Sequence, residues 1–106
     1  GLQRRDYVYI DDVVTAFVAA MAPSSAADAW PGTVVVGSGT AVNVLQLREL
    51  VSAATGGEIP VEHADQPPGE MRAVVVDRRR ANALGLGPPT ELADGLRRTW
   101  EAWPAG

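Results

Sequence analysis

Hydrophobic and polar positions follow two different periods along the chain, and the shorter period predicts strands. Residues 5–10 alternate every second position, the pattern of a short strand with two distinct faces. Residues 33–36 are a continuous β-branched run, which predicts a strand buried on both faces. Residues 61–63 and 74–76 are two shorter strand candidates. We therefore expect three or four short strands.

The first segment with helical spacing directly follows residues 5–10. Asp11 or Asp12 supplies a cap, and Pro23 stops the helix because proline cannot continue a helical backbone. Residues 23–31, rich in Ser, Ala and Pro, are expected to form a surface connection. The apolar stripe predicted for the buried face of this helix consists of Val13, Val14, Phe17, Val18 and Met21.

Three further helices are predicted from apolar spacing and from end signals. Asn43 with Gln46 three residues later has the spacing of a capping box, and glycine from Gly56 onward ends that helix. Asp77 is expected to cap a short third helix. Thr90 is expected to cap the last helix, in which the apolar positions are Leu92, Leu96, Trp100 and Trp103. Together the elements predict a small α/β layer structure of three or four short strands with four helices.

Composition limits the range of functions. The chain has 106 residues, 46% hydrophobic and 21% charged, which is typical of one small globular domain. No apolar run approaches the roughly 20 residues that span a bilayer, and a net charge of −4 argues against nucleic-acid binding. The absence of cysteine excludes disulfides and thiolate metal sites and suits a cytoplasmic protein. We expect neither a membrane nor a nucleic acid as partner.

Four motifs in order carry a family resemblance. Residues 5–13 read Arg-Asp-Tyr-Val-Tyr-Ile-Asp-Asp-Val, and residues 36–39 read Val-Gly-Ser-Gly. A Pro-Gly-Glu motif then leads to Asp77, and residues 92–99 read Leu-x-x-Gly-Leu-Arg-x-Thr. In this order they resemble the C-terminal, substrate-binding lobe of the NAD-dependent epimerase/dehydratase family, the extended short-chain dehydrogenase/reductases. UDP-glucose 4-epimerase-like members are the nearest fit.

The resemblance implies that residues 1–106 are a single substrate-binding lobe of a longer enzyme. All nine basic residues are Arg, so the Tyr-x-x-x-Lys pair of the family's hydride chemistry cannot form here. The Gly-x-x-Gly-x-x-Gly dinucleotide turn is also missing. The family carries both in its N-terminal NAD-binding Rossmann lobe. We therefore expect a fragment or truncated chain that binds no cofactor and is not catalytic alone, with NAD held by the full-length parent.

The resemblance also assigns candidate binding residues. Arg5 matches the arginine that contacts the substrate diphosphate, a group that a guanidinium binds through two oxygens at once. From its residue type alone, Arg5 could instead pair with Asp6 or a neighbouring carboxylate. Glu70 matches a carboxylate lying against the nucleotide ribose, and its alternative is an ordinary exposed loop residue.

Three positions near Glu70 affect which substrate is expected. Relatives carry a second diphosphate-binding arginine where this chain has Pro67, which has no side-chain donor. Either Arg72 replaces it or the second contact is missing. Val74 matches the position that limits the C2 substituent of the sugar, although a plain strand valine is the simpler interpretation. Val35 replaces a family asparagine beside the turn at residues 36–39.

For several other features, a structural interpretation is simpler than a functional one. The Gly-Ser-Gly turn at residues 37–39 lacks the third glycine of a phosphate loop. The pair Asp11 and Asp12 suggests acid/base chemistry, but helix capping is simpler. Residues 78–80 are three arginines expected on a solvated face. His63 is the only histidine and cannot anchor a metal site alone.

Two functional hypotheses follow. In the first, the chain is the nucleotide-sugar-binding part of an NAD-dependent nucleotide-sugar epimerase or dehydratase, and its partners are a nucleotide-diphosphate sugar and the missing Rossmann lobe. In the second, it is a stand-alone, non-catalytic nucleotide-sugar-binding or protein-interaction module. Without a covering lobe, strand edges and apolar side chains such as those of Tyr7, Tyr9 or Val36 would be exposed, so a homodimer through that face is expected.

Overall fold

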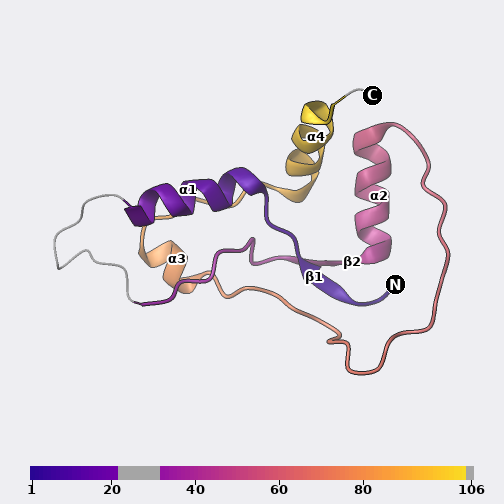
Figure 1. Ribbon diagram of the computed structural model, residues 1–106, viewed down its shortest axis with the longest axis horizontal. Helices are drawn as coiled ribbons and strands as arrows, with labels where there is room; N and C mark the ends of the chain where they lie inside the picture. Colours follow the sequence, from indigo (N-terminus) through magenta and orange to yellow (C-terminus); the bar gives the residue numbers. More distant parts are fainter. Residues whose placement is uncertain (22–31, 105–106) are drawn as a thin grey trace.

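The computed structural model of the chain describes residues 1–21 and 32–104. The predicted helix stop at Pro23 and the predicted connection over residues 23–31 lie outside these residues. The elements follow in the order β1 (Arg4–Asp6), α1 (Ile10–Met21), β2 (Ala41–Asn43), α2 (Val44–Thr55), α3 (Arg79–Ala83) and α4 (Leu92–Ala102) (Figure 1). The four predicted helices are therefore confirmed, whereas the described part of the chain has two strands instead of three or four.

The sheet is an antiparallel pair in which β1 has neighbours on both edges. Arg5 of β1 lies opposite Val42 of β2, and α2 starts directly after β2. On its other edge, β1 meets residues 72–74 in parallel. The Arg4 N–H donates to the Arg72 carbonyl at 2.8 Å, and the Val74 N–H donates to the Arg4 carbonyl at 3.0 Å. Segments from three parts of the sequence thus meet at β1.

The predicted strands at residues 33–36, 61–63 and 74–76 are wrong. The parallel pairing stops after one bridge because the Val76 N–H, two residues beyond Val74, donates to the Asp6 carboxylate at 3.0 Å. Residues 33–36 belong to no strand, and Val35 is 60% exposed, so they are not buried on both faces. The strand predicted over residues 5–10 is shorter, because α1 already begins at Ile10.

Two of the predicted helix ends are confirmed at atomic detail. At the start of α2 the Asn43 side chain accepts from the Gln46 N–H at 2.8 Å, and the Gln46 side chain accepts from the Asn43 N–H at 2.9 Å. Gly56 ends α2 with a positive φ of 78°, which glycine adopts without strain. The predicted Asp77 cap of α3 is wrong, because Arg78 occupies the cap position; Asp77 only accepts from the Arg79 N–H at 3.0 Å. The two confirmed ends are local in sequence, which is why the sequence predicted them.

The predicted caps of α1 and α4 are wrong because a tertiary contact uses the same groups. The Thr90 N–H and hydroxyl donate to the two oxygens of Asp12, at 2.7 and 2.8 Å, and Glu91 occupies the cap position of α4. Asp11 pairs with Arg98 at 3.1 Å. The first turn of α1 is thereby fastened to α4 across 78 residues of sequence. The carboxylate pair Asp11–Asp12 has a structural role here.

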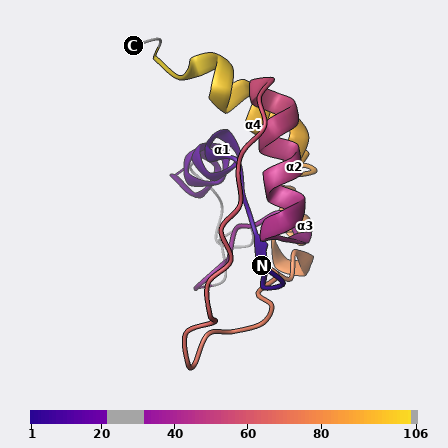
Figure 2. The same ribbon diagram turned by 90° about the vertical axis from the view of Figure 1, so that its right-hand side faces the viewer.

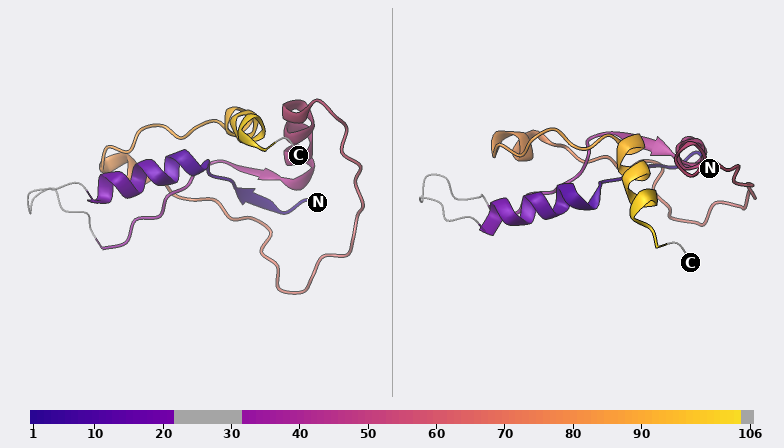
Figure 3. Two further views of the ribbon diagram at one scale, coloured as in Figure 1. Left: turned by 45° about the horizontal axis from the view of Figure 1, so that its top comes forward. Right: turned by 90° about the horizontal axis from the view of Figure 1, so that it is seen from above.

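The molecule is open and elongated. Figure 1 shows α1 and α3 at one end and α2 beside α4 at the other, and Figures 2 and 3 show that the whole is thin in its third dimension. Its extents are 52 × 37 × 20 Å with a radius of gyration of 16.7 Å, whereas a compact domain of this length has a radius of about 13 Å. The accessible surface is 7925 Å², against about 5,700 Å² for a compact protein of 11.1 kDa.

The hydrophobic core is correspondingly small. Among the described hydrophobic residues, only Ala16 of α1 and Ala81 of α3 are almost fully buried, at 4% and 1% exposure. The stripe predicted to be the buried face of α1 is largely exposed, with Phe17 at 66% and Met21 at 75%. Helix α1 buries Ala16 instead, and Val13 is the one residue of the stripe that is half-buried. An apolar face of this kind is unusual for a free-standing domain.

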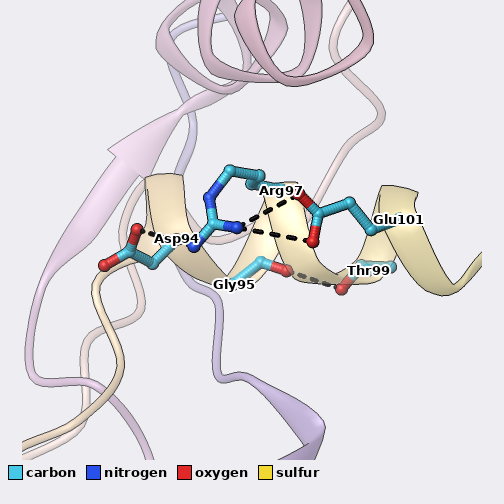
Figure 4. A network of polar contacts seen from close by, with 5 residues as sticks. All are labelled: Asp94, Gly95, Arg97, Thr99 and Glu101. Carbon is cyan, nitrogen blue, oxygen red and sulfur yellow. Dashed lines mark hydrogen bonds and ion pairs between the residues drawn. The ribbon is translucent and has the colours of Figure 1, made fainter.

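Helix α4 is amphipathic and has a charged outer face. Arg97 lies between Asp94 and Glu101, with N···O distances of 3.5 and 3.1 Å, and the Thr99 hydroxyl donates to the Gly95 carbonyl at 2.7 Å (Figure 4). Gly95 is on the inner face, where the Tyr9 ring lies against it, so that an added Cβ would approach the ring to 3.3 Å. The outer charges keep this face in solvent while the inner face packs.

Candidate functional site

Two of the predicted binding residues meet at one edge of the sheet. Arg5 Nη2 lies 3.5 Å from Glu70 Oε1, although the residues are 65 positions apart in sequence. Gln3 Nε2 donates to the other oxygen of the same carboxylate at 3.2 Å, and Arg5 Nη1 donates to the Arg4 carbonyl at 2.9 Å. We call Gln3, Arg5 and Glu70 the Arg5 cluster. Its two charged side chains are about a third exposed, 30% and 33%, so a ligand can reach both.

The local backbone explains why the three side chains converge. Gln3 and Arg5 are two residues apart on an extended segment, so they project from the same face. Glu70 comes from residues 57–72, which we call the arm; it contains no helix or strand, and all of it but Ile59 is exposed. Figure 1 shows the arm leaving α2, running around the outside and returning to β1. The hydrogen bond between the Arg4 N–H and the Arg72 carbonyl holds the returning end, two residues from Glu70.

The other predicted positions lie close to the cluster through their backbone. Arg4 and Ala73 are bridge partners, so their side chains lie on the same face of the sheet. Arg72 and Val74, the residues on either side of Ala73, lie on the other face, as Arg5 does on β1. The Arg72 side chain is exposed, and Val74 is 38% exposed. The structure thus brings all four predicted residues to one neighbourhood, with direct side-chain contact between Arg5 and Glu70. Arg5 does not pair with Asp6, but it does pair with a carboxylate, that of Glu70, so the alternative of an ion pair within the chain is met by Glu70.

Two concavities help to locate a binding surface. One of about 540 Å³ lies between Tyr7, residues 38–40 and the start of α4, and includes none of the four predicted residues. A smaller one of about 240 Å³ is lined by Gln3, Arg48, His63 and Pro67 among others. Because Gln3 also belongs to the Arg5 cluster, the smaller concavity adjoins the charged groups. The smaller concavity is therefore the better candidate for a ligand-binding surface, because the charged side chains of the Arg5 cluster lie beside it.

The Gly-Ser-Gly turn is already occupied by a carboxylate of the chain itself. Asp6 Oδ1 accepts from the Ser38 N–H at 2.9 Å and from its hydroxyl at 2.6 Å, and Oδ2 accepts from the Gly39 N–H at 2.9 Å. Burial raises the pKa of Asp6, but these hydrogen bonds and one from Val76 outweigh burial, so the pKa of the carboxyl lies below its ordinary value of 3.8. The donors that a phosphate would need are therefore taken.

Three residues that form or support the site were not predicted from the sequence. Gln3 had a usable signal, since it precedes Arg5 by two residues and so shares its face. Arg78 was expected on a solvated face, but its guanidinium donates to the Gly37 carbonyl at 2.5 Å and to the Gly87 carbonyl at 2.9 Å. Asp6 gave no sequence signal for its partners, which lie 32 to 70 positions away. Arg79, in contrast, is exposed as predicted.

The described residues limit the other classes of site. Across residues 1–21 and 32–104, His, Asp and Glu side chains do not gather into a group of three that could hold a metal ion. His63 is exposed on the arm. Within the same ranges, none of the helices has the length and apolar character needed to cross a membrane.

Comparisons with known proteins identify relatives of nearly the whole chain. It is 36% identical over 104 residues to UDP-glucose 4-epimerase of Mycolicibacterium smegmatis, and 30% identical over 104 residues to that of Bacillus subtilis. It is also 33% identical over 105 residues to a putative GDP-L-fucose synthase 2 of Arabidopsis thaliana. These alignments cover 94–95% of this chain but only 30–31% of each relative. No family model matches the chain.

The family resemblance drawn from the four motifs is therefore confirmed. Homologues of 27–36% identity, covering 92–95% of the chain, are UDP-glucose 4-epimerases and a related nucleotide-sugar enzyme. The chain spans about a third of the length of the curated relatives it matches. The resemblance thus extends beyond the motifs to almost every element of the fold.

Proposed function

We propose that this chain is the nucleotide-sugar-binding lobe of a UDP-glucose 4-epimerase-like or dehydratase-like enzyme, with Arg5 as its contact to the diphosphate. The observation that carries the proposal is the Arg5 cluster, in which a guanidinium and a carboxylate from distant segments meet on an accessible surface. The names of the relatives, which include UDP-glucose 4-epimerase and GDP-L-fucose synthase, support a nucleotide-diphosphate sugar as the ligand class.

The geometry suits the two chemical parts of such a ligand. Arg5 uses Nη1 and Nη2 once each in the described contacts, and a guanidinium carries five donors, so it can also bind an anionic oxygen. Glu70 is an acceptor that could take ribose hydroxyls once it exchanges its bond from Gln3. Arg72 lies on the same side of the pleat and can supply the second positive charge that Pro67 cannot.

The residues present do not fit an NAD site. The chain has no lysine and no Gly-x-x-Gly-x-x-Gly turn, and the N–H groups of Ser38 and Gly39 donate to Asp6. We therefore derive no step through NAD here. In the proposed enzyme, a Rossmann lobe outside these 106 residues holds NAD and supplies the acid/base group. This lobe grips and orients the nucleotide-sugar and is not catalytic alone. We also propose a cytoplasmic location, which the absence of cysteine suits.

Tyr7, Tyr9 and Val36 are half-buried, so the expected exposed face is wrong; the exposed apolar face is that of α1, and it supports association with a covering partner. The chain exposes over 2,000 Å² more than a compact protein of its mass, and a stable interface covers about 800 Å² on each partner. We propose the Rossmann lobe as the natural cover, and a second copy of the chain when that lobe is absent. The same face would equally serve a stand-alone interaction module, which is the second candidate function.

Calorimetric titration of the chain with UDP-glucose and, separately, with NAD tests the proposal. We expect measurable binding of UDP-glucose and none of NAD, with no turnover of the sugar. Binding of NAD without UDP-glucose would refute the assignment of this lobe. Binding of neither ligand, together with tight self-association, would favour the interaction module.

A further inference from the structure

One carboxylate joins β1 to the turn at residues 37–40 and to the segment that follows the arm. Asp6 follows Arg5 on β1, and its two oxygens accept four hydrogen bonds. Oδ1 takes both donors of Ser38, at 2.9 and 2.6 Å, while Oδ2 takes the Gly39 N–H at 2.9 Å and the Val76 N–H at 3.0 Å. Charge-assisted hydrogen bonds to backbone N–H groups are among the stronger polar contacts in proteins. No other described carboxylate accepts from three separate residues in this way.

We infer that Asp6 is a positioning residue of the binding site: it fastens β1, the turn at residues 37–40 and the segment at residues 72–76 together, and so sets where Arg5 lies relative to Glu70. The inference rests on the proposed function, since it concerns the same site. It adds a residue that contacts no ligand and acts through the backbone on either side of the cluster.

The link from Asp6 to Glu70 runs through a short stretch of backbone. Glu70 is held near Arg5 because the arm returns to β1 at the Arg4–Ala73 bridge, which has only two hydrogen bonds. A single bridge of this kind is marginal without support from its neighbours. The Val76 N–H donating to Asp6 supplies that support two residues beyond the bridge. Releasing Val76 would let the bridge open and Glu70 separate from Arg5.

Close packing on the other side of Asp6 supports the same conclusion. Gly37 is buried against Val76, and a Cβ at Gly37 would overlap the methyl carbons of Val76. Glycine is therefore required for the turn to approach the segment closely enough that both can donate to one carboxylate. Arg78 also holds this turn through the Gly37 carbonyl. Two contacts besides those of Asp6 therefore hold the turn in place.

Asp6→Asn tests the inference, with Asp12→Asn as the matched control. Both substitutions neutralise a carboxylate that joins segments distant in sequence, but Asp12 accepts from Thr90 and touches no part of the Arg5 cluster. In the Asp6→Asn variant the side-chain NH₂ group would face backbone N–H donors, which leaves those donors unsatisfied. The measurements are the hydrogen exchange of the Arg4 and Val74 amides relative to the amides of α2, and the affinity for UDP-glucose at a temperature where each variant is folded.

We expect about tenfold faster exchange at Arg4 and Val74 and about tenfold weaker UDP-glucose binding in Asp6→Asn, with neither change in Asp12→Asn. If Asp6→Asn does not fold, Ser38→Ala removes one of the four donors and is expected to shift both quantities in the same direction by about threefold. A lower melting temperature with unchanged exchange and affinity would overturn the inference. If the wild-type chain binds no UDP-glucose, the proposed function fails, and exchange at Arg4 and Val74 alone decides the role of Asp6.

Discussion

Replacing Arg5 by alanine should separate ligand binding from folding. Among the described residues Arg5 makes one ion pair, with an N···O distance of 3.5 Å to Glu70, and both side chains are about a third exposed. A pair at this distance and exposure contributes about 1 kcal/mol or less to the free energy of unfolding, because water screens it. The Arg5 side chain also donates to the neighbouring Arg4 carbonyl, a contact that solvent can replace. The melting temperature should therefore change little.

The same substitution should affect ligand affinity much more strongly. A guanidinium bonded to a diphosphate oxygen is a charge-assisted contact worth about 1.5–3 kcal/mol, which corresponds to a dissociation constant about 10- to 150-fold higher for Arg5→Ala. Arg5→Lys keeps the charge but loses the planar fork, so an intermediate loss is expected. Calorimetric titration with UDP-glucose measures the affinity, and thermal unfolding followed by circular dichroism measures the stability.

Arg79→Ala is the matched control for loss of one positive charge. Arg79 is exposed at the start of α3 and pairs only with the nearby Asp77 among the described residues. We expect it to leave UDP-glucose affinity unchanged. The reasoning would be refuted if Arg5→Ala unfolded the chain while retaining affinity, or if both alanine variants lost affinity equally. The first result would make Arg5 structural, and the second would show a general effect of net charge.

Three further predictions concern association, helix stability and pH. The isolated chain should self-associate, as light scattering across a dilution series would show. Phe17→Ser on the exposed face of α1 should shift the measured mass toward the 11.1 kDa monomer. A wild-type chain that stays monomeric at high concentration would contradict the prediction. Asn43→Ala removes the capping box of α2 and should lower the free energy of unfolding by about 1 kcal/mol in urea titration, whereas an unchanged midpoint would show that the box is dispensable. Because the folded-state pKa of Asp6 lies below 3.8, its carboxylate contributes stability that is present above that pH and lost as pH falls through the lower folded value. The stability difference between wild type and Asp6→Asn should therefore shrink in acid, and a pH-independent difference would contradict the assignment.

The sequence by itself determined the features that depend on near neighbours. The capping box at Asn43 and Gln46 and the glycine end at Gly56 are contacts within one helix, so residue type and spacing suffice to predict them. The four motifs likewise lie within short stretches, and they sufficed for the family resemblance. Arg5 and Glu70 could be nominated because each belongs to such a motif. Their meeting could not be derived from local pattern.

Only the tertiary structure decided which polar groups serve the site and which hold the fold. Thr90 and Asp12 each have the chemistry of a helix cap, but they bond to each other across 78 residues. The packing of the two segments brings these polar groups together, so they bond to each other and not to the N–H groups of their own helices. Asp6 takes the Val76 N–H that a third strand would have used, so a β-branched run that predicts a strand ends after one bridge.

The exposed face of α1 shows the same limit for apolar residues. Spacing every three or four residues identified an apolar stripe that includes Phe17 and Met21, and the helix forms as expected. Periodicity predicts that such a face will be covered, but it carries no information on which segment covers it. Among the described residues, four of the five stripe residues stay exposed, because the chain packs Ala16 on the opposite side. Local spacing determines the helix and its faces, whereas burial depends on surfaces supplied by segments distant in sequence or by another chain.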